Sequence, residues 1–231
     1  MSTTDALEPG RGPSHTVLAV VLQVRDTRLQ VLLWERGREP FAGRWSLPGG
    51  LLGERESLEA SIRRHLAAKV DVDELAHLEQ LQTLSDPDRH PDGHQIATAY
   101  LGLVPSDADP SLPPDTAWHP VDDLPPMAFD HRDIATSGRD RLRAKLSYTN
   151  IGFAIAPEEF TLAELRDLYA AALNRKVAST NLQRILVRRH LLVSLDRQRP
   201  PTAAGGRPAG LYRFRARALE VTDEFAVLRP R

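Results

Sequence analysis

The chain has 231 residues, of which 41% are hydrophobic and 26% charged, which is typical of a globular protein with one large domain or two smaller ones. It has no cysteine, which excludes disulfides and thiolate metal sites, and neither a membrane-spanning apolar run nor a signal-peptide pattern, so we expect a cytoplasmic protein that does not bind membranes. The net charge of −1 hides an asymmetry, because residues 1–147 carry 16 Lys and Arg against 23 Asp and Glu, whereas residues 148–231 carry 14 against 8.

The N-terminal two thirds of the chain mix strands and helices without regular βαβ repeats. Apolar and β-branched runs predict strands at residues 15–24, 28–36, 44–50, 77–86, 94–104 and 115–126, and helical spacing predicts helices at 57–69 and 129–146. The first two strands flank the turn RDT and predict a hairpin. This mixture predicts an α/β sandwich over residues 15–147, after a lead-in at 1–14 that we expect to be disordered.

The C-terminal third, residues 148–231, has a different pattern. Thr161 followed by Glu164 predicts a capping box that opens a helix, and a second helix is expected at 177–190. The strands LLVSL and LYRFRA then enclose a long basic loop. Two helices followed by such a hairpin predict a winged helix-turn-helix domain. The apolar connector SYTNIGFAIAP is expected to pack between the two domains, and residues 216–231 offer only a possible extra strand.

The stretch GLLGERESLEASIRRHLAAKVDV, residues 50–72, resembles the Nudix box, G-x5-E-x7-R-E-U-x-E-E-x-G-U, where U is aliphatic. The matching positions are Gly50, Glu56, Arg64, Leu66 and Val72. The departures are His65, Ala68, Lys69 and Asp71, which stand where the family has Glu, Glu, Glu and Gly. The preceding RWSLPGG and the surrounding strands also fit a Nudix α/β/α sandwich.

These departures bear on the chemistry of the box. Positions 65, 68 and 69 share one helix face, where the family's glutamates hold Mg²⁺, but they offer an imidazole, a methyl group and an ammonium. Glu56 alone would bind the ion weakly. We therefore expect no metal, no cofactor and at most residual hydrolysis. The Lys69 ammonium either pairs with a bound pyrophosphate in place of the metal or is a solvated lysine near the end of the helix.

A degenerate Nudix domain joined to a winged helix resembles the Nudix-related transcriptional regulators of NAD metabolism, the NrtR family. The resemblance covers about residues 15–215 and rests on the box together with DPDRHPDGHQIATAYLGLV, LPPMAFDHRDI, EEFTLAELRDLY, STNLQRILV and GRPAGLYRF. It implies a sensor for ADP-ribose or a related NAD-derived nucleotide that represses operons for NAD synthesis, salvage or pentose use. Within this frame, guanidinium groups at strand ends can grip a diphosphate. The candidate effector-binding residues are Arg36, Arg44, Gly50, Glu56, Lys69, Arg89, Asp130 and His131, with surface ion pairs and helix capping as the competing roles.

In a helix-turn-helix the N-terminal side chains of the second helix reach base edges. The candidates are Ser179, Thr180, Asn181, Gln183 and Arg184, while Leu182, Ile185 and Leu186 are expected to face the first helix. Phosphate contacts are expected from Lys176, Arg188 and Arg189, and wing contacts from Arg207 and Arg213. Such readers usually bind operator DNA as two-fold dimers, so we expect a homodimer.

Three functions remain open from the sequence. The first is a repressor whose affinity for operator DNA falls when ADP-ribose binds. The second is a weak Mg²⁺-dependent hydrolase of nucleotide diphosphates such as ADP-ribose. The third is a protein-interaction module, against which the basic charge and the polar residues 179–184 argue.

Overall fold

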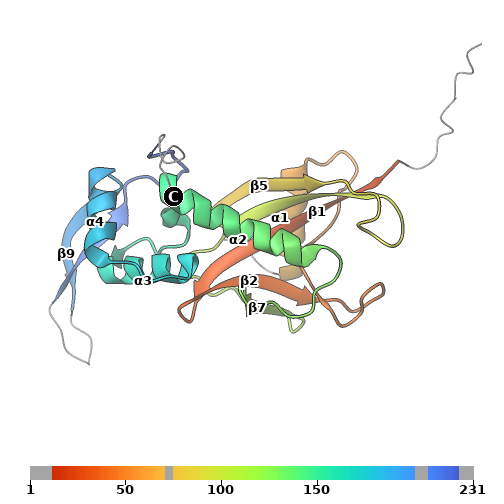
Figure 1. Ribbon diagram of the computed structural model, residues 1–231, viewed down its shortest axis with the longest axis horizontal. Coiled ribbons are helices and arrows are strands. Elements are labelled where there is room, and N and C mark those ends of the chain that lie inside the picture. Colours follow the sequence, from red (N-terminus) through yellow and green to blue (C-terminus); the bar gives the residue numbers. More distant parts are fainter. Residues whose placement is uncertain (1–11, 71–74, 201–207, 224–231) are drawn as a thin grey trace, which may run out of the picture.

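The computed structural model describes residues 12–70, 75–200 and 208–223, and Figure 1 shows their arrangement. The strands are β1 (Ser14–Arg25), β2 (Arg28–Glu35), β3 (Trp45–Ser46), β4 (Gly49–Leu51), β5 (His77–Leu84), β6 (Gln95–Leu103), β7 (Thr116–Pro120), β8 (Phe160–Thr161), β9 (Leu192–Arg199) and β10 (Ala209–Phe214). The helices are α1 (Leu58–Val70), α2 (His131–Tyr148), the short 3₁₀ helix η1 (Ile151–Ala154), α3 (Leu162–Leu173) and α4 (Ser179–Arg188).

A mixed sheet forms the larger part of the molecule. Its strand order is β3-β2-β1-β6-β5, with β4 also paired to β1 and β7 to β2. Strands β1 and β6 are parallel, and the other pairs are antiparallel. The predicted hairpin is confirmed: Arg25 pairs with Arg28 across a two-residue turn in which Asp26 and Thr27 both have positive φ.

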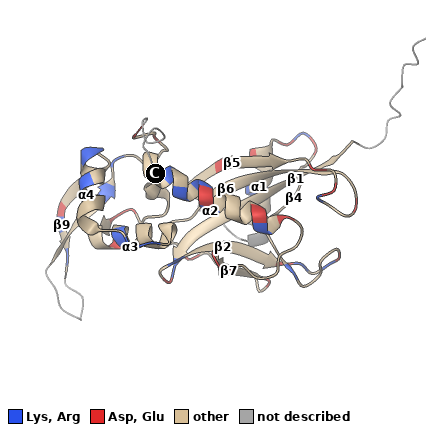
Figure 2. Ribbon diagram, in the orientation of Figure 1, with Lys and Arg blue, Asp and Glu red and all other residues tan. Residues whose placement is uncertain are grey.

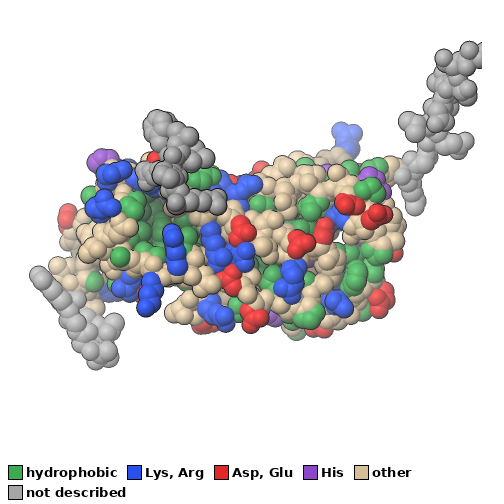
Figure 3. Space-filling view, in the orientation of Figure 1, with side chains coloured by type: hydrophobic (Ala, Val, Ile, Leu, Met, Phe, Trp, Pro, Cys, Tyr) green, Lys and Arg blue, Asp and Glu red, His purple; other side chains and the backbone are tan. Residues whose placement is uncertain are grey.

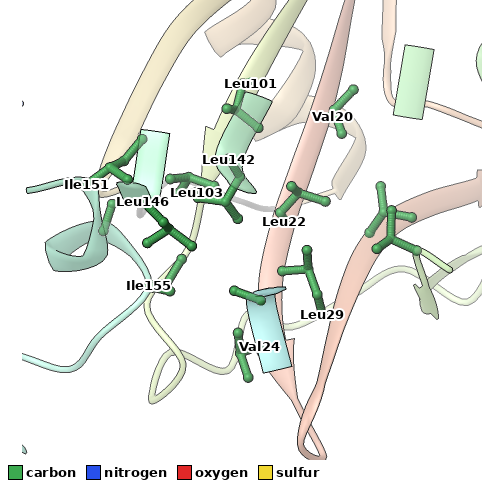
Figure 4. Close-up of a cluster of buried hydrophobic side chains, with 14 of the residues drawn as sticks. Val20, Leu22, Val24, Leu29, Leu101, Leu103, Leu142, Leu146, Ile151 and Ile155 are labelled. Atoms are coloured by element: carbon green, nitrogen blue, oxygen red, sulfur yellow. The ribbon is translucent and has the colours of Figure 1, made fainter. Parts of the chain in front are cut away.

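Strand β1 is buried on both faces, because a helix covers each side of the sheet. Val20 and Leu22 point into a core that includes Leu142 of α2, as Figure 4 shows. Alternate β1 residues such as Val21 point to the other face, where Ile62 of α1 packs. This alternation follows from the period of two along a strand. The predicted α/β sandwich is confirmed.

Some element bounds differ from the sequence prediction. Residues 44–50 were predicted as a short strand that enters a Gly-Gly loop; the strand is β3, which pairs with β2, but the two glycines belong to a further strand, β4, which pairs with β1. The change of partner brings the backbone against β1 so closely that a Cβ at Gly49 would lie 2.1 Å from the carbonyl oxygen of Val17. Helix α2 begins two residues later than expected and ends at Tyr148. It therefore crosses the boundary predicted between residues 147 and 148, and the division into domains at that point stays a prediction.

The smaller part contains α3, α4 and the sheet β8-β10-β9, which together form the predicted winged helix. The predicted capping box is present: the Glu164 amide donates to Thr161 Oγ1 at 3.2 Å, and the Thr161 amide donates to Glu164 Oε2 at 2.8 Å. Helix α4 is shorter than expected, and its Leu182 and Leu186 are buried while Ile185 is half-buried. The two-residue strand β8 is too short to show a periodic pattern in the sequence.

The connector packs between the two parts, as its composition predicted. Ile151, Phe153 and Ile155 are at most 1% exposed and belong to one continuous core with β1 and α3. Beyond β10 the chain returns to this junction, where Asn150 bonds to the backbone at Ala218 and Glu220. In the described part of residues 216–231, strand-like pairing is limited to an isolated bridge between Val221 and Thr149. No helix in the described ranges is long and apolar enough to cross a membrane.

Candidate nucleotide cleft and nucleic-acid interface

A cleft of about 400 Å³ opens at the end of the large sheet that lies away from the winged helix. Its walls come from β1, β2, the β2–β3 loop, the β3–β4 turn, the β5–β6 loop and the start of α2. The charged and aromatic residues that line it include Arg36, Arg38, Glu39, Arg89, His90, Asp92, Phe129 and His131, together with Gly50. Segments far apart in the chain therefore meet around one cavity.

Four predicted effector-binding residues, Arg36, Gly50, Arg89 and His131, line this cleft. A fifth, Asp130, does not line the cleft but holds a lining residue in place, because Arg89 donates two hydrogen bonds to its carboxylate at 2.9 and 2.7 Å. The Arg89 side chain is only 5% exposed. Asp130 occupies the N-cap position of α2 but makes no side-chain cap bond. The ion pair therefore fixes the β5–β6 loop to α2 and forms one wall of the cleft.

Two other predicted effector residues, Arg44 and Glu56, do not line the cleft. Arg44 stacks over Phe41, with its guanidinium 6.0 Å from the ring centroid. Glu56 accepts two hydrogen bonds from Arg64 at 2.8 and 2.7 Å and one from the Gly53 amide at 3.0 Å. The bonds from Arg64 hold the pKa of Glu56 at about 2, so the group is a carboxylate at neutral pH. Lys69 is part of α1, but its side chain lies outside the described residues.

His131 has a positional role in the cleft. Its Nδ1 accepts a hydrogen bond from the Leu47 amide at 3.1 Å, which ties the β3–β4 turn to the start of α2. Burial lowers the pKa of His131 to about 3, and the nearby Arg89 and Arg36 add to this effect. The ring is therefore neutral at physiological pH and carries its proton on Nε2.

The sequence analysis missed the aromatic rings that lie beside Arg36 in the cleft. Phe129 adopts a positive φ of 52°, and its ring stacks on His90 with centroids 4.7 Å apart. The Arg36 guanidinium lies 4.8 Å from the centre of the same ring, and Phe41 meets its edge. Rings next to guanidinium groups suit a ligand that combines a planar base with a diphosphate. The sequence carries no local signal for this group, because its members come from three separate loops.

The helix face that would carry a metal in a Nudix hydrolase has different chemistry here. His65 Nε2 donates to the Leu51 carbonyl at 3.0 Å, and a Cβ at Gly50 would lie 2.4 Å from Cε1 of this ring. Both Glu56 oxygens are held by Arg64. Across residues 12–70, 75–200 and 208–223, no group of three His, Asp or Glu could hold a metal ion. The donors on this face therefore do not fit Mg²⁺, which requires several oxygen ligands.

At the opposite end of the molecule, α4 presents the predicted DNA-reading side chains to solvent. Ser179, Thr180, Asn181, Gln183 and Arg184 are all exposed. Arg184 donates to Asn181 Oδ1 at 2.8 Å, so these two side chains are oriented together. Their helix packs on α3 through its opposite, apolar side. In Figure 2, α4 carries basic residues.

The residues predicted to contact phosphates and those predicted to flank the wing have different surroundings. Lys176, Arg188 and Arg213 are exposed around α4 and β10, and Arg207 lies outside the described residues. Arg189 was predicted to meet phosphates, and this is wrong. Its side chain is 12% exposed, and its guanidinium pairs with Asp223 at 2.7 Å and donates to the Ser147 carbonyl at 2.9 Å. It holds the end of α4 to the end of α2, a role set by an acid 34 residues away in the chain.

Comparisons with known proteins assign both parts. A NUDIX domain model matches residues 14–137, and an NrtR DNA-binding winged helix domain model matches residues 152–214. The ADPR responsive transcriptional repressor NtrR of Acinetobacter baylyi is 29% identical over 209 residues, covering 87% of this chain and 82% of that protein. The structure of Shewanella oneidensis NrtR complexed with a 27mer DNA is 32% identical with a TM-score of 0.74, covering 87% of this chain and 93% of that one. The NUDIX domain of that protein complexed with ADP ribose is 35% identical with a TM-score of 0.53, covering 59% and 94%.

Proposed function

The chain belongs to the NUDIX family and carries an NrtR winged helix, and from this premise we propose that it is a transcriptional repressor of NAD-metabolism genes that responds to ADP-ribose or a related NAD-derived nucleotide. The observation that carries the proposal is the joining of two sites in one chain. A cleft lined by arginines and aromatic rings lies in the NUDIX domain, and an exposed polar helix lies in the winged helix.

The cleft supports a nucleotide diphosphate as the effector. Arg36 and Arg38 supply positive charge in the β2–β3 loop, and the stacked rings of Phe129 and His90 offer a platform for a planar base. The related NUDIX domain from Shewanella oneidensis was solved with ADP ribose.

The nucleotide is bound and not cleaved. Hydrolysis in this fold needs a metal-activated water, whereas His65 and Glu56 are both engaged by neighbouring protein groups. The competing function is a weak Mg²⁺-dependent hydrolase, favoured by the retained Gly50, Glu56 and Arg64. An assay of ADP-ribose cleavage with Mg²⁺ separates the two. A turnover of about 1 s⁻¹, within the range of ordinary enzymes, would contradict the proposal that the nucleotide is bound without being cleaved.

The DNA-binding end fits a two-fold operator. The exposed residues of α4 include Asn181, Gln183 and Arg184, whose side chains form bidentate bonds to adenine and guanine in the major groove. One such module buries too little surface for useful specificity, so we expect a homodimer on a pseudo-palindrome. Half-site spacing in a dimer is geometrically strict, and a small shift between domains removes several contacts.

Helix α2 provides a route between the two sites. It begins at the cleft with Asp130 as N-cap and His131 as first residue, and it ends at the junction. There Arg189, the C-cap of α4, donates to the Ser147 carbonyl and pairs with Asp223. A displacement at the start of α2 therefore reaches the base of the DNA-reading helix. We expect ADP-ribose to lower operator affinity with a coupling of about 1–3 kcal/mol, which corresponds to roughly 5- to 150-fold.

Operator binding with and without ADP-ribose tests this function. Duplexes selected by the protein from a random-sequence library supply the operator, and calorimetry measures ADP-ribose binding to the free protein and to the DNA complex. Reciprocity requires the same factor in both directions. Asp223→Asn keeps both binding surfaces and weakens the link from Arg189, so it should reduce the factor while the free protein binds ADP-ribose normally. Equal ADP-ribose affinity in the free and the DNA-bound parent protein would contradict the proposal that ADP-ribose regulates operator binding.

A further inference from the structure

A second cleft, of about 380 Å³, lies between the NUDIX domain and the winged helix. Its walls are the β1–β2 turn, the end of β7 and the C-terminal end of α3 with the residues that follow. The charged lining residues are Arg28, Asp122, Asp167, Arg175 and Lys176. Each domain thus supplies part of the wall, and the cleft is separate from the candidate nucleotide site.

The cations of this interdomain cleft are uncompensated. Arg28, Arg175 and Lys176 are exposed, and the described residues give their side chains no ion pair or hydrogen bond. The two carboxylates, in contrast, are already neutralised. Asp122 pairs with Arg139 and Arg143 at 2.9 and 2.8 Å, and Asp167 pairs with Arg166 at 2.6 Å. The cleft therefore presents net positive charge to any group that enters it.

The position of Arg28 is fixed by the hairpin. The Asp26–Thr27 turn holds Arg25 and Arg28 opposite each other at the end of β1 and β2. Arg25 is engaged, because it pairs with Asp109 at 2.9 Å and lies over Trp118. Arg28 has no such partner among the described residues and lines the cleft at the end of α3.

On the other wall the cations lead directly into the DNA-reading helix. Asn174 ends α3 in the left-handed conformation, with φ 48°, and Arg175 and Lys176 follow before α4 begins at Ser179. The N-cap residue of α4, Ala178, provides no side-chain cap. Cations that flank the N-terminus of a major-groove helix are placed to meet the DNA backbone, because phosphates line both edges of the groove. Figure 3 shows Lys and Arg side chains gathered over α2, α3 and α4 on one face of the molecule.

We propose that the interdomain cleft binds a backbone phosphate of operator DNA, so that the NUDIX domain itself contributes a cation, Arg28, to DNA binding. This inference rests on the proposed function and adds a second domain to the DNA interface. Since the phosphate contacts Arg28 on one side and Arg175 and Lys176 on the other, it is held only while the two domains keep their relative position. Nucleotide binding that shifts the domains would release it.

The test compares Arg28→Ala with Arg63→Ala by fluorescence anisotropy with labelled duplexes over a range of salt. Arg63 is also an exposed arginine, paired with Glu59 on α1, which covers the other face of the sheet, and its replacement makes the same change in net charge. Loss of one phosphate contact lowers the slope of log affinity against log salt by about 0.9. Between about 50 and 200 mM salt, the loss of affinity should therefore be about 3.5-fold smaller for Arg28→Ala than for the parent.

The expected result is equal weakening on the selected operator and on a random-sequence duplex, with ADP-ribose affinity of the free protein unchanged. Lys176→Ala should give the same decrease in slope. A salt slope for Arg28→Ala equal to that of the parent or of Arg63→Ala would overturn the inference, as would weakening confined to the operator, which indicates a base contact. Failure of the proposed function has a different signature, since the parent protein itself would then select no DNA sequence.

Discussion

The ion pair between Arg89 and Asp130 gives the most direct test of how the nucleotide cleft is held. Asp130→Asn preserves the shape of the side chain but removes the charge that accepts two hydrogen bonds from Arg89. The Arg89 side chain, 5% exposed, is then left as a buried cation without its partner. Breaking a buried pair in this way costs about 3–5 kcal/mol. Because Asp130 is 23% exposed and its charge is partly screened, we expect a value near the lower end, about 3 kcal/mol.

Tryptophan fluorescence in urea measures this cost with a signal that comes from the NUDIX domain. The chain's three tryptophans lie in β2, β3 and β7, at Trp34, Trp45 and Trp118. With a denaturant slope of about 2 kcal/mol per molar urea, the unfolding midpoint should fall by about 1.5 M. The wall of the cleft is lost with the pair, so ADP-ribose affinity should fall by about tenfold or more, which is about 1.4 kcal/mol.

Asp133→Asn is the matched control, since it makes the same chemical change at an exposed position in the first turn of the same helix. It removes only a favourable interaction with the helix dipole, worth about 0.3–1 kcal/mol. If Asp130→Asn shifts the midpoint no further than Asp133→Asn, the pair does not stabilise the cleft. Parental ADP-ribose affinity in Asp130→Asn would separately refute the placement of the nucleotide beside Arg89.

Three further predictions concern other parts of the molecule. His131 is neutral when folded because burial lowers its pKa from 6.5 to about 3, so stability should be full above pH 6.5 and fall by about 1.4 kcal/mol per unit as the pH drops toward 3. His131→Asn should flatten this dependence in the fluorescence assay, and an unchanged slope would assign it to other groups. Arg184→Ala and Asn181→Ala should each cost about 1–3 kcal/mol in operator affinity and relax one base position, and because the two side chains are bonded their effects should not be additive. Strict additivity would mean that the two side chains are not coupled in the DNA complex, and equal loss on every sequence would mean that α4 does not read bases. Gly138→Ala should destabilise the protein despite the higher helix propensity of alanine, because its Cβ would lie 2.6 Å from Cγ1 of Val20, and a raised unfolding midpoint would show that α2 packs more loosely on β1.

The local elements of this protein follow from short-range patterns that can be recognised in the sequence. The β1–β2 hairpin and the α3 capping box depend on residues within a few positions of one another, and both were predicted. The chemistry of the box face was also accessible, because residues 65 and 68 share a helix face whatever surrounds them. The apolar connector predicted a packed junction in the same way. Periodicity and capping are local properties of the backbone, so one sequence is enough to recognise them.

The partners of the charged and aromatic side chains were decided only by the tertiary structure. Arg89 could equally have gripped a ligand or Asp130, and only the fold places that acid, 41 residues away, at bonding distance. Arg189 resembled its neighbour Arg188 in sequence, but Asp223 and Ser147 draw it into the junction. Nothing local relates Arg28 to Lys176, which share a cleft because a hairpin of one domain meets a helix of the other. A guanidinium bonds to whichever acceptor the fold brings near, so its role depends on three-dimensional geometry and not on the pattern of its neighbours in the chain.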